Sequence, residues 1–286
     1  MGVLTWTAVA VLTFIFLFWR FEVSQVYRPG RKLRATGAEL GRTFEDVHFR
    51  AADGVNLHGW FFPAEATSAR KDRVFLVCHW NEGNIGHQLR LCRVLLRTGA
   101  AVFVFDYRGY GCSRGDPMEE GTYLDAQAAH QWLRSKGFAE EGIIVFGESL
   151  GGAIATELAV REKASGLILQ STFTNVPDIG VLRFPWLPVR VLGRIRYNTL
   201  AKLPRITTPI LVMHSRTDEV VPFRQAEANF AAANEPKFFC ELPCRHYDPA
   251  CEESVFQKAV DAFLKVVENN GQAARPAPSP VPQSAA

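Results

Sequence analysis

The chain has 286 residues, 48% of them hydrophobic and 21% charged, which is enough apolar material for one large core or, less favourably, two small ones. Its formal net charge of +3 is too small for a nucleic-acid-binding surface, and the sequence has neither a basic stripe nor a zinc-type spacing of Cys and His. These values exclude nucleic acid as a partner.

The first predicted element is an uncharged apolar segment from Val3 to Trp19. As a helix it would be about 26 Å long at roughly 1.5 Å per residue, near the short end for crossing a bilayer. A signal peptide would begin with Lys or Arg and end in small residues, whereas this segment ends in Phe-Leu-Phe-Trp-Arg. Trp6 stands where myristoylation needs Ser or Thr, and the lack of a polar face argues against a buried core helix. We therefore predict an uncleaved transmembrane anchor over residues 3–21.

Basic residues crowd together directly behind this segment, at Arg20, Arg28, Arg31, Lys32 and Arg34. The positive-inside rule then places the large domain on the cytoplasmic side of the membrane. Residues 22–43, rich in Gly and Arg and without clear periodicity, are expected to form a connector.

Cysteine usage agrees weakly with a cytoplasmic domain. Cys78 and Cys92, two of the six cysteines, fall in apolar or helical patterns typical of core residues. Cys240, Cys244 and Cys251 gather near a late histidine, where an oxidising compartment could pair two of them.

The next predicted elements are strands. Phe44 to Phe49 and Val55 to Phe62 alternate apolar and polar residues around Asp53-Gly54, which indicates an antiparallel hairpin. Later strands are short continuous apolar runs, most of them followed by helical stretches, at Val74 to Cys78, Ala101 to Phe105, Ile143 to Phe146, Gly166 to Leu169 and Ile210 to Met213. This pattern predicts an α/β fold with a mostly parallel central sheet covered by helices on both faces.

The end of the chain supplies one more strand, Lys237 to Leu242, and a helix from about Glu252 to Val267. The α/β domain is therefore expected to span residues 44–268. Residues 269–286 have too little apolar matter to order, and we expect them to be disordered. Within the domain, the segment 172–203 interrupts the strand-helix rhythm with prolines and aromatic residues, which favours a short lid over the site.

Gly147-Glu148-Ser149-Leu150-Gly151 joins a predicted strand to a predicted helix. The G-x-S-x-G spacing is typical of a turn so tight that bulkier neighbours would clash. Such a turn lifts the serine hydroxyl beside a helix N-terminus, where unpaired NH groups favour developing negative charge. We therefore predict that Ser149 is a nucleophile.

A serine nucleophile needs a base and an acid that orients it, and after such an elbow both follow later in the chain. Asp218 lies in the loop after the strand ending at Met213, and His246 lies between the last strand and the last helix. We predict that these two residues complete a triad. Asp178, on the loop after the preceding strand, is a weaker candidate for the acid, and Glu219 is weaker still.

The other histidines are not expected to act as the base. His79 and His214 stand at strand ends, where a histidine more often ties loops together, and four others lie on early strands or helical faces, namely His48, His58, His87 and His130.

Acyl transfer also needs hydrogen-bond donors for an oxyanion. The backbone NH of Leu150 follows the nucleophile directly and is the first candidate. The second is expected in the Gly-rich loop after the strand Val74 to Cys78, and we nominate the NH of Asn81. The alternative is that this loop is a plain strand-to-helix turn without a catalytic part.

Taken together, these motifs resemble the α/β-hydrolase superfamily, and within it the single-pass, membrane-anchored abhydrolase-domain branch related to the bud-emergence hydrolases. The resemblance covers roughly residues 40–268. The motifs that carry it are His79-x-Asn81-x-Gly83-Asn84-Ile85-Gly86, Asp106-Tyr107-Arg108-Gly109-Tyr110-Gly111-x-Ser113, Gly147-Glu148-Ser149-Leu150-Gly151-Gly152, Asp218-x-Val220-Val221-Pro222 and His246-x-Asp248. The resemblance implies a serine hydrolase without metal or cofactor, acting on ester, thioester or occasionally amide bonds through Ser149, Asp218 and His246.

Two residues depart from the family pattern, since Trp80 replaces a usual glycine and Glu82 replaces a small residue. Both stand beside the expected oxyanion hole and put its geometry in question. The motif from Asp106 to Ser113 is interpreted as structural, a turn shaped by two glycines and a charged pair.

The expected function is membrane-anchored hydrolysis of a lipid ester, another partly apolar ester or a thioester. A serine peptidase of the same fold is one alternative. A tethered binding protein that keeps the triad but lacks a working oxyanion hole is another. We also expect the cationic and aromatic lid residues from Arg183 to Arg196 either to rest on the membrane surface or to pack on their own domain.

Overall fold

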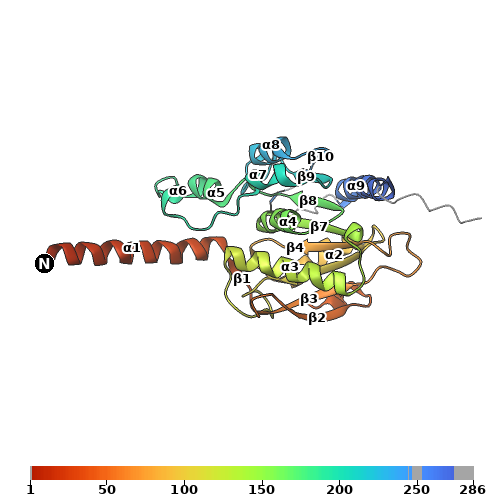
Figure 1. Ribbon diagram of the computed structural model, residues 1–286, viewed down its shortest axis with the longest axis horizontal. Helices are drawn as coiled ribbons and strands as arrows, with labels where there is room; N and C mark the ends of the chain where they lie inside the picture. Colours follow the sequence, from red (N-terminus) through yellow and green to blue (C-terminus); the bar gives the residue numbers. More distant parts are fainter. Residues whose placement is uncertain (1, 244, 247–252, 274–286) are drawn as a thin grey trace, which may run out of the picture.

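The computed structural model describes residues 2–243, 245–246 and 253–273, with the backbone alone for residues 3–5 and 271–273 (Figure 1). Cys244, Asp248, Cys251 and residues 274–286 of the expected disordered tail lie outside the described residues, whereas residues 269–273 of that tail are helical, as the end of α9 (Glu253–Ala273). Cys78, Cys92, Cys112 and Cys240 are free thiols.

An eight-stranded sheet forms the centre of the domain, in the order β10-β9-β8-β7-β4-β6-β3-β2. Its strands are β2 (Glu45–Arg50), β3 (Asn56–Phe62), β4 (Val74–Cys78), β6 (Ala101–Asp106), β7 (Ile143–Glu148), β8 (Gly166–Gln170), β9 (Ile210–His214) and β10 (Lys237–Glu241). The pairs β2–β3 and β3–β6 are antiparallel, and the remaining pairs are parallel. The predicted hairpin and mostly parallel sheet are therefore confirmed.

Helices cover both faces of the sheet because its central strands are apolar on both sides. On one face α3 (Glu119–Ser135), α4 (Leu150–Arg161) and α8 (Phe223–Ala232) pack on residues such as Val145. On the other face α2 (Leu89–Leu96) and α9 (Glu253–Ala273) pack on residues such as Ile144. Short 3₁₀ turns complete the domain at Gly37–Leu40, Ile85–Gln88, Glu140–Gly142 and Leu203–Arg205.

The segment 172–203 contains three short helices, α5 (Val176–Arg183), α6 (Val189–Leu192) and α7 (Thr199–Lys202). Asn175 begins α5 by accepting a hydrogen bond from the NH of Asp178, and Pro177 stands in its first turn. Figure 1 shows α5 and α6 above the last turns of the N-terminal helix, at one end of the domain.

The N-terminal helix α1 (Gly2–Val26) is longer than the predicted anchor and takes up the first five residues of the expected connector. No glycine or proline interrupts the sequence until Pro29, so the helix continues past the apolar segment. Behind it, β1 (Arg28–Pro29) pairs with β5 (Glu82–Gly83) beside the loop after β4. Trp6–Val26 is long and apolar enough to cross a membrane, and only 11% of its most apolar window is buried.

Candidate active site

Ser149 stands alone between the end of β7 and the start of α4, with a left-handed backbone at φ 53° and ψ −115°. This conformation is strained for a residue with a side chain, and such strain gathers at functional sites. The flanking glycines make the turn possible. A Cβ on Gly147 would lie 2.4 Å from the carbonyl oxygen of Gly151, and a Cβ on Gly151 would lie 2.0 Å from that of Cys78.

The structure brings together the three residues predicted to form a triad. Ser149 Oγ lies 3.1 Å from His246 Nε2, and His246 Nδ1 lies 2.8 Å from Asp218 Oδ2. A carboxylate can only accept, so Nδ1 carries the proton and Nε2 is left to accept from the serine hydroxyl. The serine and histidine are nearly buried, at 7% exposure each.

Asp218 is fixed by its own loop. Its Oδ1 accepts hydrogen bonds from the NH groups of Val220 and Val221 at 2.9 and 2.7 Å. Burial opposes ionisation of Asp218, but the bond from His246 and these NH groups outweigh it and hold its pKa below the usual value. His214 supports the loop through a 2.9 Å hydrogen bond from Nε2 to the carbonyl oxygen of Val221.

The two weaker candidates for the acid have other partners. Asp178 accepts hydrogen bonds from Thr174, Asn175 and Arg190 within the segment after β8. Glu219 accepts the backbone NH of His246 at 3.3 Å, not its ring.

The loop after β4 is held by aromatic hydroxyls. The hydroxyl of Tyr107 donates to the carbonyl oxygen of His79 at 2.9 Å, and that of Tyr110 donates to the carbonyl oxygen of Asn81 at 2.8 Å. The Asn81 side chain donates to the carbonyl oxygen of Val26 at the end of α1. Sequence reasoning took the tyrosine motif only as a turn, and its link to this loop depends on tertiary contacts that no local pattern shows.

Glu82 and Trp80, the two departures from the family pattern, lie differently with respect to the site. Glu82 lines the cavity beside Ser149, and its carboxylate is 3.7 Å from the guanidinium of Arg28. Trp80 is half-buried and is not among the residues that line this cavity.

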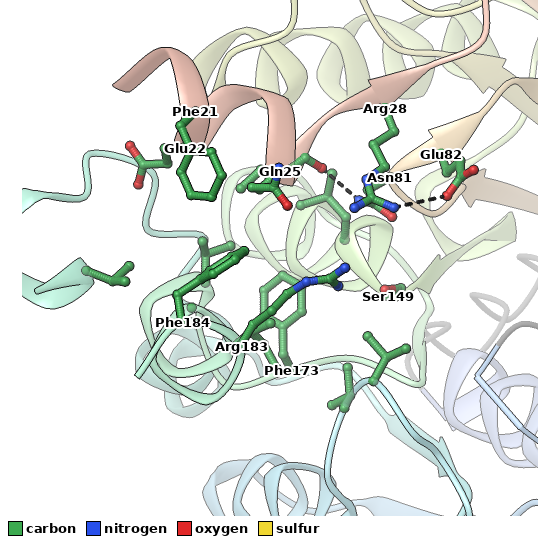
Figure 2. A pocket seen from close by; sticks show the side chains of 18 of the residues that line it. Phe21, Glu22, Gln25, Arg28, Asn81, Glu82, Ser149, Phe173, Arg183 and Phe184 are labelled. Carbon is green, nitrogen blue, oxygen red and sulfur yellow. Dashed lines mark hydrogen bonds and ion pairs between the residues drawn. The ribbon is translucent and has the colours of Figure 1, made fainter. Parts of the chain in front are cut away.

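A mainly apolar cavity opens beside Ser149 (Figure 2), and Leu150, Asn81 and His246 also line it. Its apolar walls come from α1, the lid segment and the loop of Asp218, through Phe18, Phe21, Val26, Phe173, Val176, Ile179, Phe184, Leu187, Val189, Val220 and Val221. Sequence reasoning missed the contribution of α1. One signal was present, since the apolar residues Phe21, Val23 and Val26 continue past Arg20, beyond the end of the uncharged segment.

One group of described residues has the spacing of a metal site, namely Asp46, His48 and His58. It lies on β2 and β3, at the sheet edge away from Ser149. His58 Nε2 is 2.7 Å from Asp46 Oδ1, and the Trp60 indole donates to the same oxygen, so these groups are partnered without an ion.

Comparison with known proteins gives one consistent result. The family model described as "Serine aminopeptidase, S33" matches residues 69–204. An uncharacterized protein of Mycobacterium tuberculosis is 35% identical over 93% of this chain and 94% of its own length. The alpha/beta hydrolase domain-containing protein WAV2 of Arabidopsis thaliana is 32% identical over 78% of this chain and 80% of its own length. The protein bem46 of Schizosaccharomyces pombe is 29% identical over 89% of each chain.

A Pyrococcus furiosus esterase is similar in structure, with a TM-score of 0.71 at 22% identity over 84% of this chain and 99% of that chain. At this identity the likeness concerns the fold.

Proposed function

Because the chain belongs to the α/β-hydrolase family that includes WAV2 and bem46, and is an esterase-like serine hydrolase, we propose that it cleaves carboxylic ester or thioester bonds of a partly apolar substrate. Ser149 is the nucleophile, His246 the base and Asp218 the acid that orients it. The continuous hydrogen-bonded chain from Ser149 Oγ to Asp218 at the mouth of an apolar cavity carries this proposal.

The reaction proceeds in two halves. His246 Nε2 takes the proton of Ser149 Oγ as Oγ bonds to the substrate carbonyl carbon, and the resulting oxyanion accepts from the NH groups of Leu150 and Asn81. The carbon–leaving-group bond then breaks, the alcohol or thiol takes the proton from His246, and an acyl-serine remains. His246 then takes a proton from water as the water oxygen attacks this ester, and returns the proton to Ser149 Oγ as the bond between Oγ and the acyl carbon breaks, which releases the acid and restores Ser149. Asp218 stays ionised and stabilises the imidazolium.

We further propose that α1 anchors the enzyme in a membrane, with the hydrolase domain of about residues 44–268 on the cytoplasmic side. The apolar, largely exposed α1 and the basic residues behind it support this arrangement. In the lid segment, whose helices α5 and α6 lie beside the last turns of α1 (Figure 1), Trp186 is 76% exposed and Val191 80% exposed, so the lid can rest on the membrane surface.

The lid arginines take a smaller part in this contact than their charge suggests. Arg190 pairs with Asp178 at 2.9 Å, and the guanidinium of Arg194 lies over the ring of Trp19. If the lid rests on the membrane, Trp186→Ala should weaken binding to anionic liposomes, in a sedimentation assay, of a protein that lacks residues 3–15 but keeps the turns of α1 that contact the lid. Equal binding by the parent and the variant would contradict lid contact.

Hydrolysis assays on the full chain test the reaction class. We expect turnover of p-nitrophenyl esters and acyl thioesters by the parent chain and none by Ser149→Ala. A peptidase is the second candidate, suggested by the description of the matching family model. Cleavage of aminoacyl anilides with no cleavage of esters would favour it. No turnover of any of these substrates by the parent would favour a binding protein.

A further inference from the structure

The last turns of α1 form one wall of the cavity beside Ser149. Phe18, Phe21 and Val26 line it from the helix, opposite Ile179 and Phe184 of the lid segment. The rings of Phe21 and Phe184 meet edge to face, with centroids 5.1 Å apart. The cavity is therefore incomplete without the helix, which a simple tether would not require.

Hydrogen bonds fasten this wall to the lid segment. The carboxylate of Glu22, only 7% exposed, accepts the backbone NH groups of Arg194 and Ile195 at 3.0 and 3.2 Å. The indole of Trp19 donates to the carbonyl oxygen of Leu192 at 3.1 Å. A buried carboxylate that accepts hydrogen bonds from several NH groups of another element fixes the position of the two elements relative to each other. The wall is thus a built part of the domain.

The same helix continues away from the domain with its apolar side chains exposed. Leu17, directly before the cavity residue Phe18, is 59% exposed, and Leu12 is 66% exposed. Figure 1 shows this part of α1 projecting from the end of the domain that carries α5 and α6. Apolar side chains of α1 therefore extend from the segment suited to a bilayer as far as the cavity.

The aromatic residues of the cavity gather away from Ser149. Figure 2 shows Phe21 and Phe184 at this far end, with Glu22 and Gln25 beside Phe21 on the helix, and Arg28, Asn81 and Glu82 toward Ser149. The side chain of Arg183 runs between the two ends. A bound ester would place its carbonyl and polar head at the Ser149 end and its hydrocarbon chain at the far end.

We propose that the substrate is a long-chain acyl lipid of the membrane that α1 spans, and that its acyl chain reaches Ser149 by passing between α1 and α5. This inference rests on the proposed hydrolase function and adds the class of substrate and its route. Phe18 and Ile179 then set the preferred chain length from opposite walls.

The first test measures kcat/KM for acyl esters of increasing chain length with the full chain reconstituted in liposomes. Each buried methylene should raise kcat/KM about four-fold until the cavity is filled. Ile179→Trp should fill the cavity and lower kcat/KM for long chains by about ten-fold or more while short esters are still hydrolysed. Phe18→Ala should shift the optimum to longer or bulkier chains. Phe16→Ala, on the exposed face of α1, is the matched control and should keep the parent profile.

Two results of this assay are distinct. If short esters are hydrolysed and both cavity variants keep the parent chain-length profile, the acyl chain does not lie between α1 and α5, and the inference is overturned while the hydrolase function stands. If the parent hydrolyses none of the esters, whatever their chain length, the proposed hydrolase function itself is contradicted. Turnover of short esters by each variant also shows that it is folded.

The second test concerns the route. A long-chain phospholipid that does not exchange between vesicles is placed either in the vesicles that hold the enzyme or in separate vesicles. We expect the phospholipid to be hydrolysed only when it is in the same vesicles as the enzyme. Equal rates in the two arrangements would overturn uptake from the membrane of α1.

Discussion

At the scale of single residues, the site depends on two carboxyl groups with opposite environments. Asp218 is held ionised by NH groups and by His246, which keep its pKa low. Glu148, directly before Ser149, is fully buried, and its carboxylate oxygens have no hydrogen-bond partner among the described residues. Burial raises the pKa of Glu148 well above its usual value, so this carboxyl group keeps its proton to a higher pH than Asp218 does.

Asp218→Asn should lower kcat for ester hydrolysis by about 10⁴-fold with little loss of stability. The amide can donate to His246 Nδ1, so the proton of the neutral imidazole moves to Nε2. Nε2 can then no longer accept the proton of the Ser149 hydroxyl. Steady-state kinetics measures the effect, and Asp178→Asn is the control because its carboxylate accepts from Thr174, Asn175 and Arg190, which all belong to the lid segment. A comparable loss of kcat in Asp178→Asn would contradict the assignment of Asp218 as the acid.

Glu148→Gln should stabilise the protein increasingly as the pH rises above about 4.5. In the parent the unfolded chain releases this proton while the folded chain keeps it, so stability falls by about 1.4 kcal/mol per pH unit until the raised pKa is reached. Thermal unfolding of the detergent-solubilised parent and variant between pH 5 and pH 8 measures the difference. Parallel pH dependences for the two proteins would contradict a neutral Glu148.

At the scale of elements, α1 and the lid segment act as a unit through Glu22. Its carboxylate accepts hydrogen bonds from the backbone NH groups of Arg194 and Ile195. Tyr27 at the base of the helix adds a 3.0 Å hydrogen bond to Tyr197, which also contacts Thr122 of α3. The helix end, the lid and the main domain therefore share one network.

Glu22→Ala should loosen the lid without unfolding the domain. Leaving the buried NH group of Ile195 without its acceptor costs about 1–3 kcal/mol, and the part-buried NH group of Arg194 loses the same acceptor. We expect faster tryptic cleavage after Arg183, Arg190 or Arg194 in limited proteolysis, followed by peptide mass spectrometry. Ser24→Ala is the control, since Ser24 is exposed and bonds only within its own helix. Equal cleavage rates in the parent and both variants would contradict the fastening role of Glu22.

The elements themselves could be predicted from sequence because apolar runs and turn residues mark each strand locally. The same holds for the elbow, where Gly147 and Gly151 report a backbone too crowded for any Cβ. The triad of Ser149, Asp218 and His246 could be predicted from the order of these residues along the chain. The structure adds the distances between their side-chain atoms. The cavity wall formed by Phe18 and Phe21 could not be predicted, because their composition suits a bilayer as well as a pocket and only tertiary packing distinguishes the two.

At the scale of the whole molecule, the active-site cavity, the lid and the exposed part of α1 lie at one end of the domain (Figure 1). A helix that both spans the bilayer and lines the cavity would hold Ser149 at a fixed height above the membrane. In the topology that we propose, the basic residues that follow the apolar segment place this end at the cytoplasmic surface.

Cys112 reports the side of the membrane on which the domain lies, because it is an exposed free thiol of that domain. We expect a membrane-impermeant maleimide to leave it unmodified in intact cells and to modify it after the membrane is opened. Peptide mass spectrometry locates the adduct, and Cys112→Ser identifies the signal of this thiol. Modification in intact cells would place the domain outside.

The catalytic role of Ser149 is tested most directly by reaction of the full chain with a fluorophosphonate probe and mapping of the adduct by peptide mass spectrometry. A fluorophosphonate bonds only to a serine whose hydroxyl is activated by its base. We predict one adduct on Ser149 in the parent, strongly reduced labelling in His246→Ala, and none in Ser149→Ala. An unlabelled parent, or an adduct on another residue that persists in Ser149→Ala, would contradict this role.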